Sequence, residues 1–506
     1  MVPTWQLRAA FAQRLSAMYG TEVPAYTTLL EVAGQVNDEV AARDPDAARF
    51  GSIDRVTAER HGAIRVGTPE ELRQAAQIFA ALGMHPVGFY DLRDGEGAVP
   101  VVSTAFRPTD PEELDRNPFR VFTSLLTTGD RRFFDPDLES RLDAFLARRQ
   151  LFPPELLRLA ARAEAGAGLP ADQAERFLTQ AVAAFELSPE PVDRAWYAEL
   201  ERVSAVAADI GGVAATHINH LTPRVLDIDA LYRRMGERGI TMIDRIQGPP
   251  RWDGPDVLLR QTSFRALAEP RAFRDPDGGV TPGSLRVRFG EVEARGIALT
   301  RAGRARYDHL MAETDRRTAL RPDADRQETA RSLWQRGFPG TEHQLAVSHQ
   351  AFFTYRPVAG RPRDGRCPPA DLTRLLTHGW LTAHPVVYED FLPRSAAGIF
   401  RSNLTGEGTR DADLAGTPFD AHRLAEALGR PVHDPFTLYA RQQDRSLRQA
   451  LFTLQAGAAL RALDHGELID TEPTGTEPTG TEPTGTEPTG TGATGTAPGT
   501  TSADRP

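Results

Sequence analysis

The chain has 506 residues, of which 40% are hydrophobic and 25% are charged, and its formal net charge at pH 7 is -10. The length and composition are typical of a globular protein with a large core, and the length alone permits two to four domains. The negative charge argues against undirected binding to nucleic acid or to an anionic membrane. No apolar run approaches the roughly 18 residues of a transmembrane helix, and the N-terminus lacks the apolar core of a secretory signal. We therefore expect a cytoplasmic protein.

Two absences restrict the chemistry of the chain. Its only cysteine, Cys367, excludes an internal disulfide, an iron–sulfur cluster and a multi-thiolate zinc site, and we expect this thiol to be a bystander. There is no lysine, so all 59 basic residues are arginines. This excludes Schiff-base catalysis by lysine and a standard phosphate-loop lysine. Any bound metal must be held by imidazole and carboxylate groups.

The predicted elements, taken in chain order, begin with helices up to about Arg43, followed by a strand-like run, HGAIRVG. The next helix opens at Thr68 with Glu71 three residues on, which is the spacing of a capping box, and it ends at Gly83. The run MHPVGFYDL then returns to a strand pattern. Helical patterns predominate from about 111 to 206, and a second strand-like run, ATHINHLTPRVLDI, precedes the helix IDALYRRMGERG. Extended segments and then further helices complete the pattern.

These patterns divide the chain into six segments. They are N-terminal helices (1–50), a first β–α module (51–110), a helical insertion (111–206), a second β–α module with the segment that follows it (207–410), C-terminal helices (411–470) and a tail (471–506). The tail repeats TEPTG four times and lacks large apolar groups, so it cannot offset its own ordering entropy. We expect the tail to be disordered.

The segments after His61 and His220 look like two copies of one unit. HGAIRVGTPEELRQAAQIFAALGM aligns with HLTPRVLDIDALYRRMGERGI. Each copy has a histidine, an arginine four residues later, then valine, and then a helix that ends at glycine followed by an apolar residue. Two matching β–α units, each with a metal-capable residue on its first strand, predict a pseudo-symmetric pair of modules.

This repeat selects His61 and His220 from the twelve histidines as candidate metal ligands. Strand alternation places His217 on the opposite face from His220. A third ligand must be an oxygen donor, and the strand-like run RFGEVEARG carries Glu291 and Glu293 on one face, so alternation leaves that choice open. Two histidines and one carboxylate predict an octahedral iron(II) site with open positions for substrate and dioxygen.

Several long motifs resemble one family, the 2-oxoadipate dioxygenase/decarboxylase family, which is related to the vicinal oxygen chelate superfamily. The resemblance runs from about Tyr19 to about Leu460. It rests on RHGAIRVGTPEEL, STAFR, NPFRVFTSLL, HINHLTPRVLDIDAL, LLRQTSFRAL, RFGEVEARGIALT and YEDFLPRSAAGIFRSNL. It implies an α+β fold in which two vicinal-oxygen-chelate-like β–α modules form a central metal-holding sheet, with helical insertions and helical terminal regions.

The resemblance also implies a metal site. The family carries iron(II), Fe(2+), on the histidine of RHGAIRV, on the second histidine of HINH and on the first glutamate of FGEIE. In this sequence those residues are His61, His220 and Glu291, so the resemblance favours Glu291 over Glu293.

Substrate-binding residues follow from the same motifs. The arginine of HGAIR falls on Arg65, and a further contact comes from FLPxSAAGIF, which places Arg394 and Ser395 at the substrate. Arg394 stands where relatives carry a small apolar residue, and this departure could shift substrate preference. Arg65 lies four residues beyond His61 with the same strand parity, ~13 Å away along an extended strand. It could therefore form a bidentate pair with the far carboxylate of a six-carbon diacid.

The implied reaction converts 2-oxoadipate and dioxygen to 2-hydroxyglutarate and carbon dioxide, a step of lysine catabolism. The expected partners are a small 2-oxo diacid and dioxygen, with no nucleic acid and no membrane. Two alternatives stay open. One is another vicinal-oxygen-chelate enzyme, such as a ring-cleaving dioxygenase or a glyoxalase-like isomerase. The other is a non-catalytic metal-containing protein that binds 2-oxo acids. The oligomeric state is left open.

The composition of the tail gives a first testable prediction. Deleting the chain after about Asp470 should leave kcat and the melting temperature nearly unchanged, because the tail has no large apolar groups to bury. Differential scanning calorimetry and turnover of the truncated and full-length chains check this. A clear drop in melting temperature on truncation would show that the tail packs against the rest of the protein.

Overall fold

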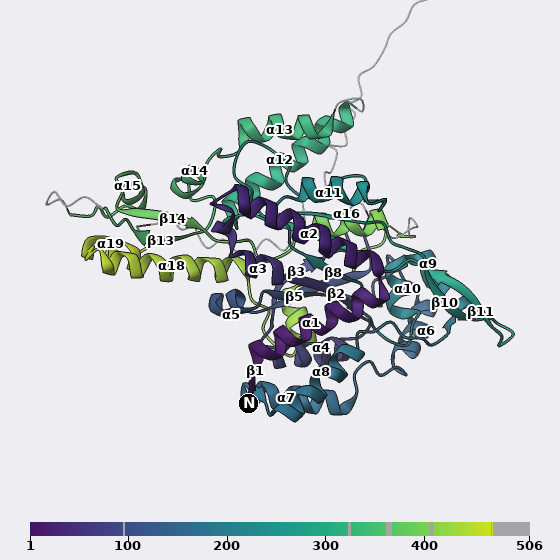
Figure 1. The fold of residues 1–506 in the computed structure, drawn as a ribbon. Helices are drawn as coiled ribbons and strands as arrows, with labels where there is room; N and C mark the ends of the chain where they lie inside the picture. The colour runs from purple at the N-terminus through teal and green to yellow at the C-terminus, as the bar shows by residue number, and fades with distance from the viewer. Residues whose placement is uncertain are drawn as a thin grey trace, which may run out of the picture.

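The computed structural model has a mixed α+β architecture, in which helices surround a central sheet (Figure 1), as predicted from the sequence. It describes residues 1–94, 97–321, 325–360, 367–403, 409–411, 413–466 and 468. The predicted tail, 471–506, lies outside these described residues. The predicted N-terminal helices are α1 (Thr4–Glu22) and α2 (Pro24–Arg43), which lie side by side across the sheet.

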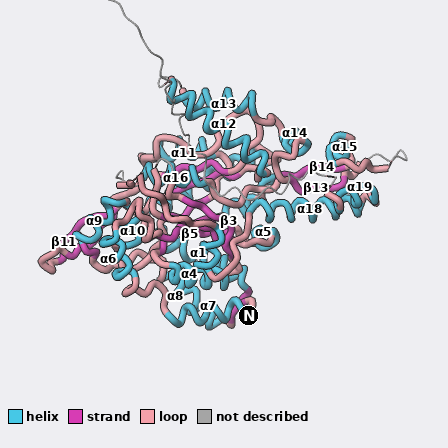
Figure 2. The backbone as a smooth tube through the Cα atoms, turned by 180° about the vertical axis from the view of Figure 1, so that it is seen from behind, coloured by secondary structure: helices cyan, strands magenta, loops and turns pink. Residues whose placement is uncertain are grey.

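The largest sheet has five strands in the order β3-β4-β5-β2-β8. Its strands are β2 (Arg60–Val66), β3 (His85–Asp91), β4 (Val101–Arg107), β5 (Phe119–Leu126) and β8 (His220–Pro223). Strand β2 pairs with β5 in parallel and with β8 in antiparallel orientation, so β2 lies inside the sheet. Figure 2 shows these strands at the centre of the molecule, enclosed by helices.

The first β–α module runs from β2 through helix α4 to β3, β4 and β5. Helix α4 (Pro69–Ala81) begins at the predicted capping box, in which Thr68 and Glu71 bond each other's backbone amides. Gly83 follows the helix with a φ of 68°, a conformation that glycine adopts without strain. The buried face of α4 includes Leu72, Ala75 and Phe79, so the helix is held by packing as well as by its cap.

The second module repeats this order from β8 through helix α11 (Ile228–Glu237) to β9 (Leu259–Ser263) and β12 (Glu291–Arg295). Bridges from Met242 and Gln247 add a short segment beside β9, in the place that β3 has in the first module. A hairpin of β10 (Glu269–Arg274) and β11 (Val280–Leu285) lies between β9 and β12 and projects from the body of the molecule (Figure 1).

The two modules meet where β2 pairs with β8, and the register of this pairing is that of two copies related by a two-fold axis. In the antiparallel pairing, Gly62 lies opposite Leu221. These two residues each follow the histidine of their own copy, so they are counterparts in the repeat. His61 and His220 are therefore placed symmetrically about the point where the modules join. The paired modules agree with the sequence duplication.

The elements outside the modules differ in part from the sequence pattern. Strand β5 lies within the stretch 111–206 that reads as helical; all its residues are buried, so it shows no alternation that would reveal a strand. Two helices, α12 (Arg301–Leu320) and α13 (Arg326–Gly337), lie within 207–410, between the extended segments and the C-terminal helices. They share a second hydrophobic core with α18 (Pro435–Thr453) and the strand pair β13 (Phe353–Pro357) and β14 (Leu381–Pro385). The six segment boundaries stay a proposal.

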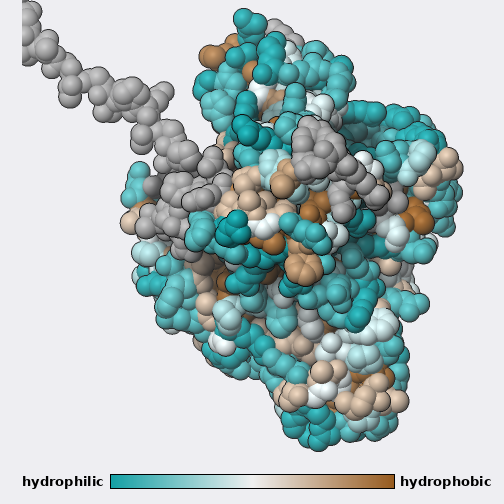
Figure 3. Space-filling model, turned by 90° about the vertical axis from the view of Figure 1, so that its left-hand side faces the viewer, coloured by the Kyte–Doolittle hydropathy of each residue, from teal (hydrophilic) through white to brown (hydrophobic). Residues whose placement is uncertain are grey.

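Within the described residues, no helix is both long and apolar enough to span a bilayer. The face in Figure 3 is largely hydrophilic, with small hydrophobic patches between. The large hydrophobic side chains that are exposed in the described part of the chain are well separated in the sequence: Met1, Leu267, Val280, Leu320, Leu414 and Phe452.

The junction of the modules yields a stability prediction. A Cβ at Gly62 would lie 2.6 Å from Ile218 Cδ1 and 3.2 Å from Leu221 Cδ2. Gly62→Val should therefore overpack the junction and lower the free energy of unfolding by roughly 1–3 kcal/mol, as measured in urea. The matched control is Gly34→Ala in α2, where a Cβ meets nothing within 4 Å. Equal effects of the two substitutions would contradict tight packing at the junction.

Candidate metal centre

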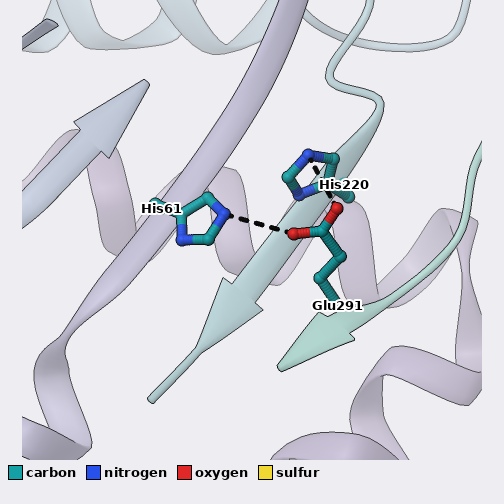
Figure 4. Close-up of side chains that lie close together, drawn as sticks. All are labelled: His61, His220 and Glu291. Atoms are coloured by element: carbon teal, nitrogen blue, oxygen red, sulfur yellow. Dashed lines mark ion pairs between the residues drawn. The ribbon is translucent and has the colours of Figure 1, made fainter. Parts of the chain in front are cut away.

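His61, His220 and Glu291 come together on the inner face of the paired modules. Their ligand atoms all lie within 4.8 Å of one another, and all three residues are buried. They extend from β2, β8 and β12 toward one point (Figure 4). His61 Nε2 lies 3.4 Å from Glu291 Oε2, and His220 Nε2 lies 3.6 Å from Glu291 Oε1. The sequence-predicted residues are thus adjacent in space, although 230 positions separate the first from the last.

The second nitrogen of each imidazole is engaged elsewhere. His61 Nδ1 lies 2.9 Å from Glu293 Oε2, and His220 Nδ1 lies 3.0 Å from Thr222 Oγ1. Both rings thereby direct Nε2 toward Glu291. A carboxylate or hydroxyl behind a histidine fixes its tautomer and ring orientation, as it does behind metal-bound histidines. Glu293 and Glu291 share a face of β12, and the structure places Glu291 beside Nε2 of both histidines and Glu293 beside Nδ1 of His61.

The electrostatics of the cluster suit a cation. Burial raises the pKa of Glu291 despite the nearby His61. Burial alone would lower the pKa of His61, but Glu293 and Glu291 outweigh it and leave that pKa raised. The pKa of His220 is lowered by burial and then by His61. A buried carboxylate between two imidazole nitrogens is costly unless a proton or a metal ion compensates it. Two nitrogen donors and one oxygen donor fit a divalent transition metal.

A buried network of ion pairs surrounds Glu293 on the side away from the triad. Arg295 donates to both Glu293 oxygens, at 2.7 and 2.9 Å, and also lies 3.2 Å from Glu59. Glu59 accepts from Arg120 at 2.7 Å and from Arg224 at 2.9 Å. The side chain of Glu59 is fully buried. Burial opposes ionisation of Glu59, yet the surrounding arginines hold its pKa well below the usual value.

The network continues away from the candidate metal centre through Glu389. Arg120 donates to one oxygen of Glu389, and Arg55 donates to the other at 2.6 Å. Arg295 also donates to the backbone oxygens of Tyr388 and Asp390, at 2.8 and 3.1 Å. Residues from both modules and from the segment after β14 are thus joined in one chain of ion pairs that ends at His61. This network could not be predicted from the sequence, because no motif or spacing links its members.

Apolar rings and one amide complete the surroundings of the triad. Phe391 packs edge-on against His61 at a centroid distance of 4.9 Å, and Phe289 stacks on His220 at 5.4 Å. Gln261 Nε2 donates to Glu291 Oε2 at 3.4 Å. The rings keep water from one side of the cluster, which strengthens electrostatic interactions inside it.

Arg65 shares the inner face of β2 with His61, as strand parity predicted, and it is buried. Its guanidinium pairs with Asp209 on helix α10 (Ala205–Gly211). Asp209 also accepts from Asn219 at 2.9 Å and lies 3.4 Å from His217. Arg65 is therefore held in place by a carboxylate, Asp209, that no sequence motif indicated.

His217 lies outside the triad, as expected, but for a different reason from the one predicted. Strand β8 begins at His220, so residues 216–219 are not part of a regular strand and alternation does not govern them. His217 instead contacts Asp209 and Asn219. Burial lowers the pKa of His217 to about 4, in spite of Asp209. His217 is therefore neutral near pH 7.

The predicted substrate segment forms helix α16 (Pro393–Asn403). Ser395 is buried in its first turn. Arg394 belongs to the same turn, but its side chain lies outside the described part of the structure. Asn403, at the end of the helix, donates to Ser263 Oγ at 2.8 Å and so fastens α16 to β9.

Comparison with known proteins identifies relatives along most of the chain. The model of the 2-oxoadipate dioxygenase/decarboxylase family matches residues 11–403. A 2-oxoadipate dioxygenase/decarboxylase of Mycobacterium tuberculosis is 58% identical over 441 residues, which cover 86% of this chain and 96% of the relative. The protein of the same name from Escherichia coli is 40% identical over 452 residues, covering 88% and 97% of the two chains.

A solved structure agrees with these matches. The crystal structure of the hydroxyglutarate synthase from Pseudomonas putida in complex with 2-oxoadipate superposes with a TM-score of 0.75 at 40% identity. The superposition covers 90% of this chain and 99% of that chain. With the match of the family model and the identity to its members, this places the chain in the 2-oxoadipate dioxygenase/decarboxylase family.

Proposed function

We propose that this protein converts 2-oxoadipate and dioxygen to 2-hydroxyglutarate and carbon dioxide, with iron(II) bound by His61, His220 and Glu291. The observation that carries the proposal is the buried cluster of two imidazoles and one carboxylate, in a chain that matches the family model over residues 11–403. The relative from Pseudomonas putida, whose structure was solved with 2-oxoadipate, supports the same substrate. The proposal places this reaction in the cytoplasm, as a step of lysine catabolism.

The net reaction balances without another co-substrate. The six-carbon acid loses its first carbon as carbon dioxide, and the keto carbon becomes a carboxylate by taking up one oxygen atom. The neighbouring carbon gains the second oxygen atom as a hydroxyl group. Both atoms of dioxygen are consumed, and iron(II) supplies the redox chemistry that allows dioxygen to react with the 2-oxo acid.

The residues of this chain orient the reactants and keep water out. Glu293 and Thr222 hold the two imidazoles with Nε2 directed inward, which pre-organises the metal centre. Phe391 and Phe289 shield the rings of His61 and His220. Water excluded from the centre cannot compete with the 2-oxo acid or with dioxygen.

Arg65 is proposed to bind the distal carboxylate of 2-oxoadipate. It lies on the same face of β2 as His61, and its guanidinium is oriented by Asp209. A guanidinium held in this way loses little further freedom on binding a second carboxylate. Ser395 and Arg394 remain proposed substrate contacts from the first turn of α16.

A direct test loads the protein with iron(II) under anaerobic conditions and then adds 2-oxoadipate and air. We expect uptake of one dioxygen per 2-oxoadipate, with 2-hydroxyglutarate and carbon dioxide identified by mass spectrometry. An isomerase would consume no dioxygen. Binding of 2-oxoadipate without turnover would instead indicate a binding protein.

Replacing a proposed ligand should remove the metal. His61→Ala, His220→Ala and Glu291→Ala should each abolish turnover and lower iron content after reconstitution to near background, because two protein ligands hold iron(II) poorly against water. Metal analysis of the desalted proteins measures this. His217→Ala is the matched control, since His217 contacts Asp209 and not the triad, and it should retain metal. Similar metal loss in the control would show that the ligand set is misassigned.

Arg65 gives a further prediction, on substrate selectivity. Arg65→Ala should leave iron affinity intact but cost roughly 2–4 kcal/mol in kcat/KM for 2-oxoadipate, because a charge-assisted pair is lost. For 2-oxohexanoate, which has a methyl group in place of the distal carboxylate, the same change should cost much less. Arg65→Lys should restore activity only in part, since an ammonium lacks the planar fork of a guanidinium.

The four combinations of enzyme and substrate form a cycle that isolates this contact. Equal losses for the two acids would assign Arg65 to the chelating end of the substrate or to the strand itself. Because Arg65→Ala also leaves Asp209 without its arginine, the free energy of unfolding is measured in parallel to separate a folding defect from a binding defect.

A further inference from the structure

The pseudo-two-fold relation between the modules fixes which residues are counterparts at the metal centre. Arg65 and Arg224 each lie four residues after their histidine, so they are counterparts. In the first module, Arg65 lies opposite Ser124 of the parallel strand β5. In the second module, Arg224 lies opposite Glu293, again in parallel. Ser124 and Glu293 are therefore counterparts as well.

Two residues earlier on the same strands, Phe122 is the counterpart of Glu291. Side chains two apart on a strand share a face, so Phe122 and Glu291 both face the inside of the paired modules. The register agrees, because Phe122 lies opposite Ala63, and Ala63 lies opposite His220 on the other side of β2. A two-fold operation that exchanges His61 and His220 thus also exchanges Glu291 and Phe122.

The surroundings of Phe122 fit this position beside the metal centre. Phe122 is buried, and its ring lies 5.1 Å from the ring of Phe391, which itself packs against His61 at 4.9 Å. Tyr90 packs on Phe122 at 5.3 Å. The position related to Glu291 by the two-fold axis is therefore occupied by a ring that has no donor atom.

We propose that Phe122 occupies the position of a fourth protein ligand and, by offering no donor, keeps that side of the metal centre open to the reactants. This inference rests on the proposed function, because it requires a metal on His61, His220 and Glu291. On an octahedral metal ion, three protein ligands leave three positions for exchangeable ligands, whereas four protein ligands leave only two. The two-fold symmetry of the modules defines four side-chain positions around the metal. Because Phe122 fills one of them without a donor atom, the protein supplies three ligands.

The sharpest test moves the carboxylate across the two-fold axis. Glu291→Ala alone should lower the affinity for iron(II), measured by anaerobic isothermal titration calorimetry, by at least about 100-fold. Adding Phe122→Glu to Glu291→Ala should recover at least about 10-fold of that loss, because His61, His220 and a glutamate at 122 form the two-fold image of the original triad. The readout is binding of the metal ion alone and requires no turnover.

The matched control is Ser124→Glu combined with Glu291→Ala. Position 124 is the counterpart of Glu293, which contacts the far nitrogen of His61 and is not in the triad. The control places the same charge on the same face of the same strand and should recover no metal. Recovery by the control equal to that of Phe122→Glu would show a general charge effect and overturn the proposal.

Because a glutamate among the aromatic rings could prevent folding, Phe122→His combined with Glu291→Ala is prepared alongside. An imidazole keeps a ring at this position and still supplies a donor. Failure of both variants to regain metal overturns the proposal, whether or not they fold. If Glu291→Ala by itself keeps full affinity, the ligand assignment in the proposed function fails instead, so the two failures are distinguishable.

Phe122→Glu in the otherwise unchanged protein tests the functional half of the proposal. With four donors, the protein should keep or gain iron(II) affinity while kcat/KM for 2-oxoadipate falls by at least about 100-fold, because one of the three positions open to the reactants is filled. Phe122→Leu, which offers no donor, should retain metal and much more of the activity. Full activity of a metal-loaded Phe122→Glu enzyme would contradict the assignment.

Discussion

The structure depends on the burial of charge along the inner face of the paired modules. Glu59, Glu293 and Glu291 are all buried there, and an isolated carboxylate in such surroundings would cost several kcal/mol. Each must therefore have a cationic partner at a fixed position. For Glu59 and Glu293 the partners are arginines, and for Glu291 the two imidazoles fill that role together with the proposed metal ion. The strands that carry these groups cannot shift without leaving a charge unpaired.

The cations that bridge the carboxylates of this network are all arginines. Arg120 joins Glu59 to Glu389, and Arg295 joins Glu293 to Glu59, so each guanidinium bridges two carboxylates. A planar fork with five donors can do this, whereas an ammonium group on a flexible stem acts as a single point charge. The network ends at Glu293, which lies beside Nδ1 of His61. Because the ion pairs fix Glu293, they also help to fix the orientation of the imidazole.

A symmetric frame carries an asymmetric site. Pairing of β2 with β8 at Gly62 and Leu221 places the two histidines as equivalents, but the metal-capable cluster found among the described residues takes its carboxylate, Glu291, from the second module alone. The same asymmetry appears one step further out, where His61 is backed by Glu293 and His220 by Thr222. A duplicated module can therefore keep its fold, which is set by packing and register, while single side chains on its inner face decide what the site binds.

The sequence by itself determined those features that local chemistry controls. The capping box at Thr68, the strand around His61 and the shared parity of His61 and Arg65 follow from spacing alone, and the repeat selected His220 over His217. The family was recognisable from long motifs, which also favoured Glu291 over Glu293. Strand β5 was missed, because a fully buried strand has no alternating pattern.

Tertiary structure decided what depends on contacts between distant segments. It paired Asp209 with Arg65, built the network around Glu59, brought Glu293 to Nδ1 of His61, and paired β5 with β2 so that Phe122 lies opposite Ala63. These residues lie on different elements and come from positions that no spacing connects. Only strand register and the need to pair buried charges bring them together, and both arise when the modules pack against each other.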